Sequence, residues 1–271
     1  MSVMETSNLS REFLRQMFSE GKRFDGRGLL ELRDVEISYD VSNKAEGSAR
    51  VKMGKTEVVA GIKLSPGDPY PDSLDKGNLI VSGDLLPLAS PRFESGPPGF
   101  EGIEGPRLID RMIRESGMID LKKLVIKQGE RVWNVFIDVY PINDDGGLTD
   151  ASSLACVAAL KQAMMPHLDA DGRIDYDQDA TQKLPLHAHL PLSFTFFKLG
   201  GNLILHPTRE EEEACEAKVT FGISKWNGQY MIHSCQKGWA SPFTQAEIEH
   251  IAKILPEKYE ELHKKVNKFI K

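Results

Sequence analysis

Three arginines on one predicted helix are the residues best suited to chemistry in this sequence. Arg107, Arg111 and Arg114 lie at positions i, i+4 and i+7 within PRLIDRMIRESG, residues 106–117. Because an α-helix repeats every 3.6 residues, the guanidinium groups line one face and apolar side chains fill the other. Guanidinium groups bind phosphate oxygens bidentately, and a row of them follows a polyanionic backbone. The stripe is therefore a candidate phosphate-binding face.

The same arginines have a plainer interpretation, in which they form a solvated face paired with nearby acids. Glu104, Asp110 and Glu115 lie in or beside the helix, and Arg111 with Glu115 has the i, i+4 spacing of a helical ion pair. The residues alone slightly favour this paired surface and leave both interpretations open.

A run of acids and a pair of histidines are candidate metal ligands. Residues 210–213 are four glutamates, and carboxylate oxygens suit Mg²⁺. His187 and His189 point to one side of an extended segment. Each group has a structural explanation as well, because Thr208 and Glu211 fit a capping box and two histidines without a third ligand usually have packing or surface roles. We predict no metal site and no cofactor.

A glycine-containing stretch is a candidate phosphate loop. NDDGGLTDAS, residues 143–152, precedes a predicted helix, and helix N-termini bind anions. A turn followed by a helix cap explains these residues equally well, so the stretch alone does not decide between the two.

The composition limits where any nucleic acid can bind. The 271 residues contain 34 Lys and Arg against 40 Asp and Glu, a formal net charge of −6, so binding needs a local basic patch. No signal-peptide pattern or long apolar run is present, which predicts a cytoplasmic protein without membrane contact. Three cysteines without CxxC spacing fit core thiols in a reducing compartment (Cys156, Cys215, Cys235).

Strands followed by helices, twice over, must position these residues. Alternating patterns and turn signals predict strands at 32–39, 47–53, 56–64, 78–86, 123–127, 132–141, 190–197, 202–205, 217–225 and 229–236. Helical spacing predicts helices at 8–20, 104–117, 149–165 and 243–271. Asn8 or Ser10 can cap the first of these helices, and Thr149 or Asp150 can cap the third. The last helix is expected to be broken or kinked near Pro256. The pattern predicts an α+β protein of two related lobes.

The predicted order of strands and helices divides the chain into three segments. Residues 1–22 are expected to form an N-terminal docking helix, residues 23–170 a first lobe, and residues 171–271 a second lobe with a C-terminal helix. Each lobe is expected to pack a mixed β-sheet against helices.

The segments resemble the RNase PH family of phosphorolytic 3′-to-5′ exoribonucleases over roughly residues 20 to 260. The motifs that carry the resemblance are FDGRG (24–28), GSARVKMGKTEVVAGIK (47–63), RLIDRMIR (107–114) and FIDVYPINDDGGLTDASSLACVAAL (136–160). KGNLIVSGDLLPLASPRFESGPPG and GGLTDASSLA are similar to one branch, the RNase PH-like subunit of the archaeal exosome that lacks catalysis of its own. The resemblance implies an RNase PH-like fold.

Two departures from the active family support the non-catalytic branch. Active members carry a Gly-Thr-Arg-Thr loop whose arginine helps to hold phosphate, whereas residues 147–150 are Gly-Leu-Thr-Asp, and Asp150 would weaken an anion site. Lys218 aligns with the catalytic aspartate, and an ammonium group cannot replace a carboxylate that holds a metal or accepts a proton. We therefore expect no catalytic residues.

The resemblance implies a role in RNA degradation through partners. It implies a heterodimer with a catalytic RNase PH-like subunit, three such dimers in a hexameric ring, RNA-binding cap subunits, and single-stranded RNA held at Arg107, Arg111 and Arg114. One alternative is an active phosphorolytic exoribonuclease or polymerising enzyme that uses Glu216 and nearby carboxylates. Another is a purely structural subunit whose arginines pair with acids at a protein interface.

Overall fold

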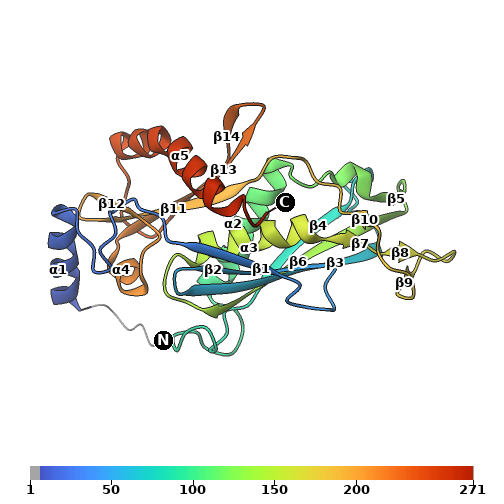
Figure 1. The fold of residues 1–271 in the computed structure, drawn as a ribbon, viewed down its shortest axis with the longest axis horizontal. Coiled ribbons are helices and arrows are strands. Elements are labelled where there is room, and N and C mark those ends of the chain that lie inside the picture. Colours follow the sequence, from blue (N-terminus) through green and yellow to red (C-terminus); the bar gives the residue numbers. More distant parts are fainter. Residues whose placement is uncertain (1–6, 271) are drawn as a thin grey trace.

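The computed structural model describes residues 7–270, so residues 1–6 of the predicted docking segment lie outside it. Within the described residues, two large β-sheets enclose two long helices (Figure 1). None of the helices in this part of the chain has the length and apolar character that a membrane span requires.

The first sheet is mixed and has the order β1-β2-β3-β6-β4, with β5 also paired to β6. Its strands are β1 (Val35–Tyr39), β2 (Gly47–Met53), β3 (Thr56–Gly67), β4 (Asn78–Gly83), β5 (Val125–Lys127) and β6 (Arg131–Asn143). β4 runs parallel to β6, and the other pairs are antiparallel. Gly54, with φ of +63°, makes the predicted tight turn between β2 and β3.

The second sheet has the order β12-β11-β13-β14. Its strands are β11 (Leu192–Leu199), β12 (Asn202–Leu205), β13 (Ala217–Trp226) and β14 (Gln229–Gly238). All three pairings are antiparallel. The expected mixed pairing is therefore found in the first sheet, whereas the second sheet is purely antiparallel. Gly200-Gly201 and Asn227-Gly228 form the predicted hairpin turns, and all four have positive φ.

Two short strand pairs lie between the sheets in sequence and were not predicted. β7 (Met164–Met165) pairs with β10 (Gln182–Lys183), and β8 (His167–Leu168) pairs with β9 (Ile174–Asp175). A 3₁₀ turn at Leu121–Leu124 precedes β5.

Helix α3 (Leu148–Gln162) is the centre of the molecule. It packs on β2 and β3 of the first sheet and on β11 of the second, and its residues from Asp150 to Leu160 are all buried. Four alanines in this stretch let the helix approach both sheets closely. One apolar core therefore continues through both halves, and the division at residue 170 stays a prediction.

Helices α1 (Asn8–Ser19) and α4 (Arg209–Ala214) lie together at one end of the molecule (Figure 1). Leu14 and Phe18 of α1 join a small apolar cluster with Phe197 and Leu199 of β11. The start of α1 is capped by Ser7, whose Oγ accepts from the Ser10 N–H, rather than by Asn8 or Ser10. Burial of two large apolar side chains docks this helix on the second sheet.

Helix α5 (Gln245–Val266) closes the chain beside the second sheet, and β1 also contacts it. The Tyr259 hydroxyl donates to the Leu190 carbonyl at 2.9 Å. Pro256 lies within the helix and does not break it, although the sequence predicted a break or kink. Thr244 caps its start through a capping box with Glu247.

Candidate nucleic-acid interface

Helix α2 (Phe100–Ser116) carries the three arginines and packs along β4, β13 and β14. It starts four residues before the predicted position 104, and Pro106 lies inside it, so the proline does not mark the first turn. Its buried face is apolar (Leu108, Ile109, Met112, Ile113). Because those residues occupy the core side, Arg107, Arg111 and Arg114 are all exposed on the opposite side, as the helical spacing predicts.

Arg114 is held by groups of its own chain. Its Nη2 and Nε donate to the two carboxylate oxygens of Asp110 at 2.6 and 3.0 Å, and Nη2 also donates to the Leu79 carbonyl of β4. The hydrogen bond to Asp110 raises the pKa of Arg114. The positive charge of Arg114 is therefore largely compensated within the chain.

Arg111 contacts a neutral partner. Its Nη1 donates to Oε1 of Gln236 on β14 at 2.8 Å. Within the described residues it makes no ion pair with Glu115, so the pairing suggested by i, i+4 spacing is wrong for this arginine. The amide orients the guanidinium group and leaves its charge uncompensated.

Arg107 makes no hydrogen bond or ion pair with any of residues 7–270. The acid one turn before it, Glu104, is engaged by Lys218 of β13, with 3.3 Å between Nζ and Oε2. The ammonium group of Lys218 also lies 5.2 Å from the ring centroid of Trp239. By binding Glu104, Lys218 leaves the charge of Arg107 available.

A groove of about 210 Å³ runs beside these two arginines. It is lined by Phe100, Ile103, Glu104, Arg107, Leu108, Arg111 and Gln236. The groove therefore combines an apolar side with two cations whose charge is not compensated by a neighbouring acid.

A second cavity, of about 70 Å³, lies where the sequence placed the altered catalytic residues. Thr149, Glu212, Lys218 and Arg92 are among the side chains that line it. The Gly147 N–H, at the N-terminus of α3, donates to Oε2 of Glu212 at 2.8 Å. A carboxylate of the chain therefore occupies the helix end that was a candidate phosphate loop.

Asp150 does not face that cavity, contrary to the sequence interpretation. It accepts hydrogen bonds from the Ser193 hydroxyl and from the N–H and hydroxyl of Thr195 on β11, at 2.8 to 3.0 Å. Burial raises the pKa of Asp150 to about 7. The N-cap of α3 is Gly147, whose backbone lies in the left-handed region, and Thr149 and Asp150 lie within the helix, so the predicted caps are wrong.

The acidic run is used as the start of α4. Thr208 and Glu211 form the capping box, and buried Glu211 accepts from Arg23 Nε at 3.0 Å. Arg209 Nε donates to Glu213 at 3.0 Å. The magnesium interpretation therefore has no support from these side chains.

Glu216, the carboxylate of the enzyme alternative, lies elsewhere. Its Oε1 accepts from the Gly200 N–H at 3.1 Å, and Arg15 of α1 lies 3.8 Å from its other oxygen. It is absent from the lining of the cavity that contains Lys218.

The two histidines pack around an aromatic ring. The ring centroids of His187 and His189 lie 5.3 and 4.3 Å from that of Trp226, and His189 Nε2 lies 2.8 Å from the Ser116 carbonyl. Burial lowers the pKa of His189. A packing role accounts for both side chains.

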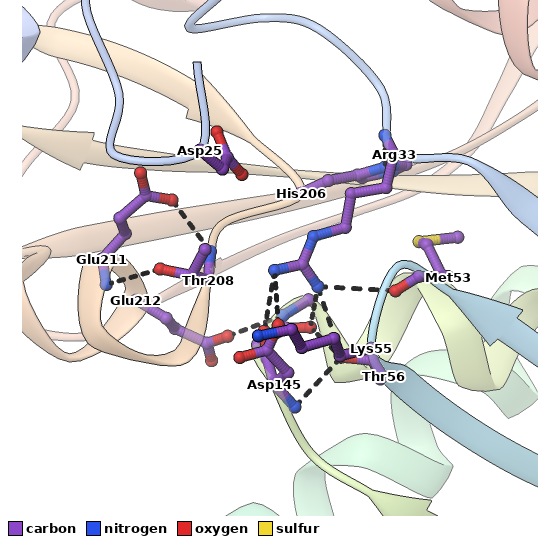
Figure 2. A network of polar contacts seen from close by, with 12 residues as sticks. Asp25, Arg33, Met53, Lys55, Thr56, Asp145, His206, Thr208, Glu211 and Glu212 are labelled. Carbon is purple, nitrogen blue, oxygen red and sulfur yellow. Dashed lines mark hydrogen bonds and ion pairs between the residues drawn. The ribbon is translucent and has the colours of Figure 1, made fainter. Parts of the chain in front are cut away.

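The loop before α3 is fixed by a buried polar network that sequence reasoning missed (Figure 2). Arg33 Nη2 donates to the Asp145 carbonyl at 2.8 Å, and the Thr56 hydroxyl donates to the Gly146 carbonyl at 2.6 Å. The Arg33 N–H donates to Nδ1 of His206 at 3.1 Å. Burial is the largest cause that lowers the pKa of both Arg33 and His206. Alternation in LRDVEISY places Arg33 on the same face as the buried Val35 and Ile37, so the period of two was the local signal that could have marked a buried arginine.

Comparisons with known proteins agree with this architecture. Residues 31–166 match the model of the 3′ exoribonuclease family, domain 1, and residues 189–254 match domain 2. The exosome complex component Rrp42 of Methanosarcina acetivorans is 43% identical over 257 residues, 94% of this chain and 92% of that protein.

Solved structures agree as well. A chain of the Archaeoglobus fulgidus exosome with RNA bound to the active site is 40% identical, with a TM-score of 0.82 and coverage of 93% of this chain and 98% of that one. A chain of an archaeal exosome core is 36% identical, with the same TM-score and coverage of 95% and 96%.

Proposed function

Because the chain belongs to the RNase PH family of 3′ exoribonucleases, we propose that it is an exosome core subunit that binds single-stranded RNA and has no catalytic site of its own. The observation that carries the proposal is that two exposed arginines on α2 have no acidic partner within the described residues. Arg107 has no partner among residues 7–270, and Arg111 contacts only the neutral amide of Gln236. Exposed guanidinium groups without acids are suited to RNA phosphates.

The proposed contacts are made to phosphates, so binding is independent of sequence. With a net charge of −6 the chain repels RNA over much of its surface, and the two arginines supply the local attraction. Among the three arginines of α2, Arg114 makes the weakest contact with an RNA phosphate in this proposal, because Asp110 compensates its charge.

Three features support the absence of catalysis. Lys218 stands where the family has a catalytic aspartate and is ion-paired with Glu104. Glu212 accepts the Gly147 N–H, and a carboxylate there repels inorganic phosphate. Residues 147–150 contain no arginine. Together these features support a cavity in which a lysine replaces the catalytic carboxylate and a carboxylate occupies the anion site.

The proposed partner is a catalytic RNase PH-like subunit, with which this chain forms a dimer and, through three dimers, a hexameric ring. RNA-binding cap subunits and a cytoplasmic location complete the proposal. By holding the backbone near its 3′ end, Arg107 and Arg111 would place the last linkage at the partner's phosphate site. Positioning of this kind lowers the barrier of a bimolecular reaction without any chemistry from the positioning residue.

The test measures phosphate-dependent release of nucleoside diphosphates from a single-stranded RNA. The chain alone is compared with its complex with the catalytic homologue, as wild type and as the double variant Arg107→Glu and Arg111→Glu. We expect no activity from the chain alone and a large loss in the double variant. The slope of log affinity against log salt should also fall by about 1.4, at about 0.7 for each lost phosphate contact.

Size-exclusion chromatography of the complex separates the remaining outcomes. Unchanged degradation by the double variant at moderate salt would overturn RNA binding, and loss of the complex itself would favour a structural role of the arginines. Activity from the chain alone that Glu216→Gln removes would make the chain an enzyme.

A further inference from the structure

We propose that Phe100 is a stacking platform that holds one RNA base beside the phosphate-binding arginines. The inference rests on the proposed function and adds a base contact to it. Phe100 is the first residue of α2, its side chain is 74% exposed, and it lines the same groove as Arg107 and Arg111. A flat apolar ring and neighbouring cations match the two parts of a nucleotide, its base and its phosphate.

The helix geometry places these groups in one row. Phe100, Ile103, Arg107 and Arg111 follow one another at intervals of three, four and four residues, so they share one face of α2. At a rise of 1.5 Å per residue, the ring precedes Arg107 by about 10 Å along the axis, and Arg111 follows it by about 6 Å. Gln236 of β14 closes the row at Arg111. A strand of RNA that follows this row can contact the Phe100 ring and the guanidinium groups of Arg107 and Arg111 in turn.

The fold itself does not use the ring of Phe100. It belongs to neither apolar core cluster, and no ring contact joins it to another aromatic side chain within residues 7–270. Phe93 of the same loop is different, because it is only 7% exposed. An exposed phenyl group beside two cations is therefore better explained by a ligand than by packing.

The chain before α2 fixes where the ring lies. Pro97 and Pro98 restrict the backbone, and the N-cap Gly99 follows them directly. A Cβ on Gly102 would lie 3.2 Å from Cβ of Pro98, so the first turn of the helix packs closely on the loop. This support lowers the conformational entropy that the segment around the ring would lose when a base stacks against it.

A protein partner would have to satisfy the same cations. A protein side chain that covers Phe100 would also need acids at Arg107 and Arg111, whereas a nucleotide supplies the aromatic face and the negative charge in one molecule. We therefore assign the groove to RNA, and contact with a protein is an outcome of the test.

The test measures RNA binding by the complex with the catalytic homologue in the absence of inorganic phosphate, so that the RNA stays intact. The variants are Phe100→Ala, Phe100→Trp and the control Tyr176→Ala. Tyr176 is 75% exposed and lies near a lysine, Lys63, but does not line the groove. Each is tested with a uniform RNA and with a series that carries one abasic nucleotide at successive positions.

We expect Phe100→Ala to weaken binding of the uniform RNA about tenfold, or about 1.4 kcal/mol. Phe100→Trp and Tyr176→Ala should bind as the wild type does. An abasic nucleotide at one position should weaken the wild type and cause no further loss in Phe100→Ala. The salt dependence should stay unchanged in Phe100→Ala, because stacking releases no counterions.

The outcomes separate this inference from the proposed function. Wild-type binding by Phe100→Ala, together with a loss in the double arginine variant, would overturn the base contact alone. No loss in either variant would overturn both proposals. A complex that dissociates in Phe100→Ala would show that the ring contacts a protein and would overturn stacking.

Discussion

The ammonium group of Lys218 lies 3.3 Å from the carboxylate of Glu104, and this ion pair joins β13 to α2. Both side chains are largely buried, at 11% and 13% exposure. The ion pair has two effects, because it holds Lys218 in the cavity lined by Thr149 and Glu212 and removes from Arg107 the acid one turn away. In the proposed function, this ion pair leaves Arg107 free for RNA.

Lys218→Asp should therefore weaken RNA binding without creating activity. The new carboxylate would face Glu104 across a few ångströms, and Glu104 would turn to Arg107, so we expect a severalfold loss of RNA affinity in the complex and no nucleoside diphosphate release by the chain alone. The double variant Glu104→Gln and Lys218→Asp should recover the affinity. Phosphorolysis by Lys218→Asp alone would contradict our account of the cavity.

Arg114→Gln should change RNA affinity less than twofold, because Asp110 already compensates the charge. Its main effect should be on the protein, where loss of the contacts to Asp110 and to the Leu79 carbonyl lowers the free energy of unfolding by about 1 kcal/mol. Urea denaturation and RNA titration of the same sample measure both. Arg107→Gln is the matched comparison. It should lower RNA affinity more than Arg114→Gln does and change the free energy of unfolding less.

Stability should depend on pH through Asp150. Its pKa in the folded protein, about 7, is higher than the ordinary 3.8, so the folded state holds the proton more tightly than the unfolded chain. The stability due to this proton is fully present below about pH 4 and is lost as the pH rises through 7.

Asp150→Asn removes the titration, so its free energy of unfolding should fall less between about pH 5 and pH 8 than that of the wild type. The difference should be of the order of a few kcal/mol, measured by urea denaturation at each pH. Asp144, whose pKa burial raises to about 6, is present in both proteins and cancels from the comparison. Parallel pH profiles would contradict the assignment to Asp150.

Thr56→Val should destabilise the protein by about 1–3 kcal/mol. The hydroxyl of Thr56 donates to the Gly146 carbonyl and accepts from the Asp145 N–H, so the substitution leaves two loop groups without this partner. Thr181→Val, at an exposed position, is the control and should lie within about 0.5 kcal/mol of the wild type. Equal stability of the two variants would show that the network in Figure 2 does not hold the loop.

Local patterns were sufficient for much of the fold. The strand at 202–205 was predicted to the residue because a Gly-Gly turn marks its start, and the arginine stripe followed from helical spacing alone. The start of α2 lies four residues before the predicted position 104, because the helix begins at Phe100 and continues through Pro106. Local signals therefore located elements better than their ends.

The roles of individual charges depended on contacts distant in sequence. The sequence places Asp150 beside an anion site, whereas its partners in the structure are Ser193 and Thr195, more than 40 residues away. Likewise, spacing suggested Glu115 as the partner of Arg111, and the observed partner is Gln236 on another element. No single sequence contains a signal for such pairings, because they depend on how β11 and β14 pack against the helices.

The burial of α3 between two sheets makes the two halves a single cooperative unit. A fragment that ended near residue 170 would expose to water the side of α3 that β11 covers, and a fragment that began there would lack the helix on which its sheet rests. We therefore expect one unfolding transition for the whole chain and no independently stable half.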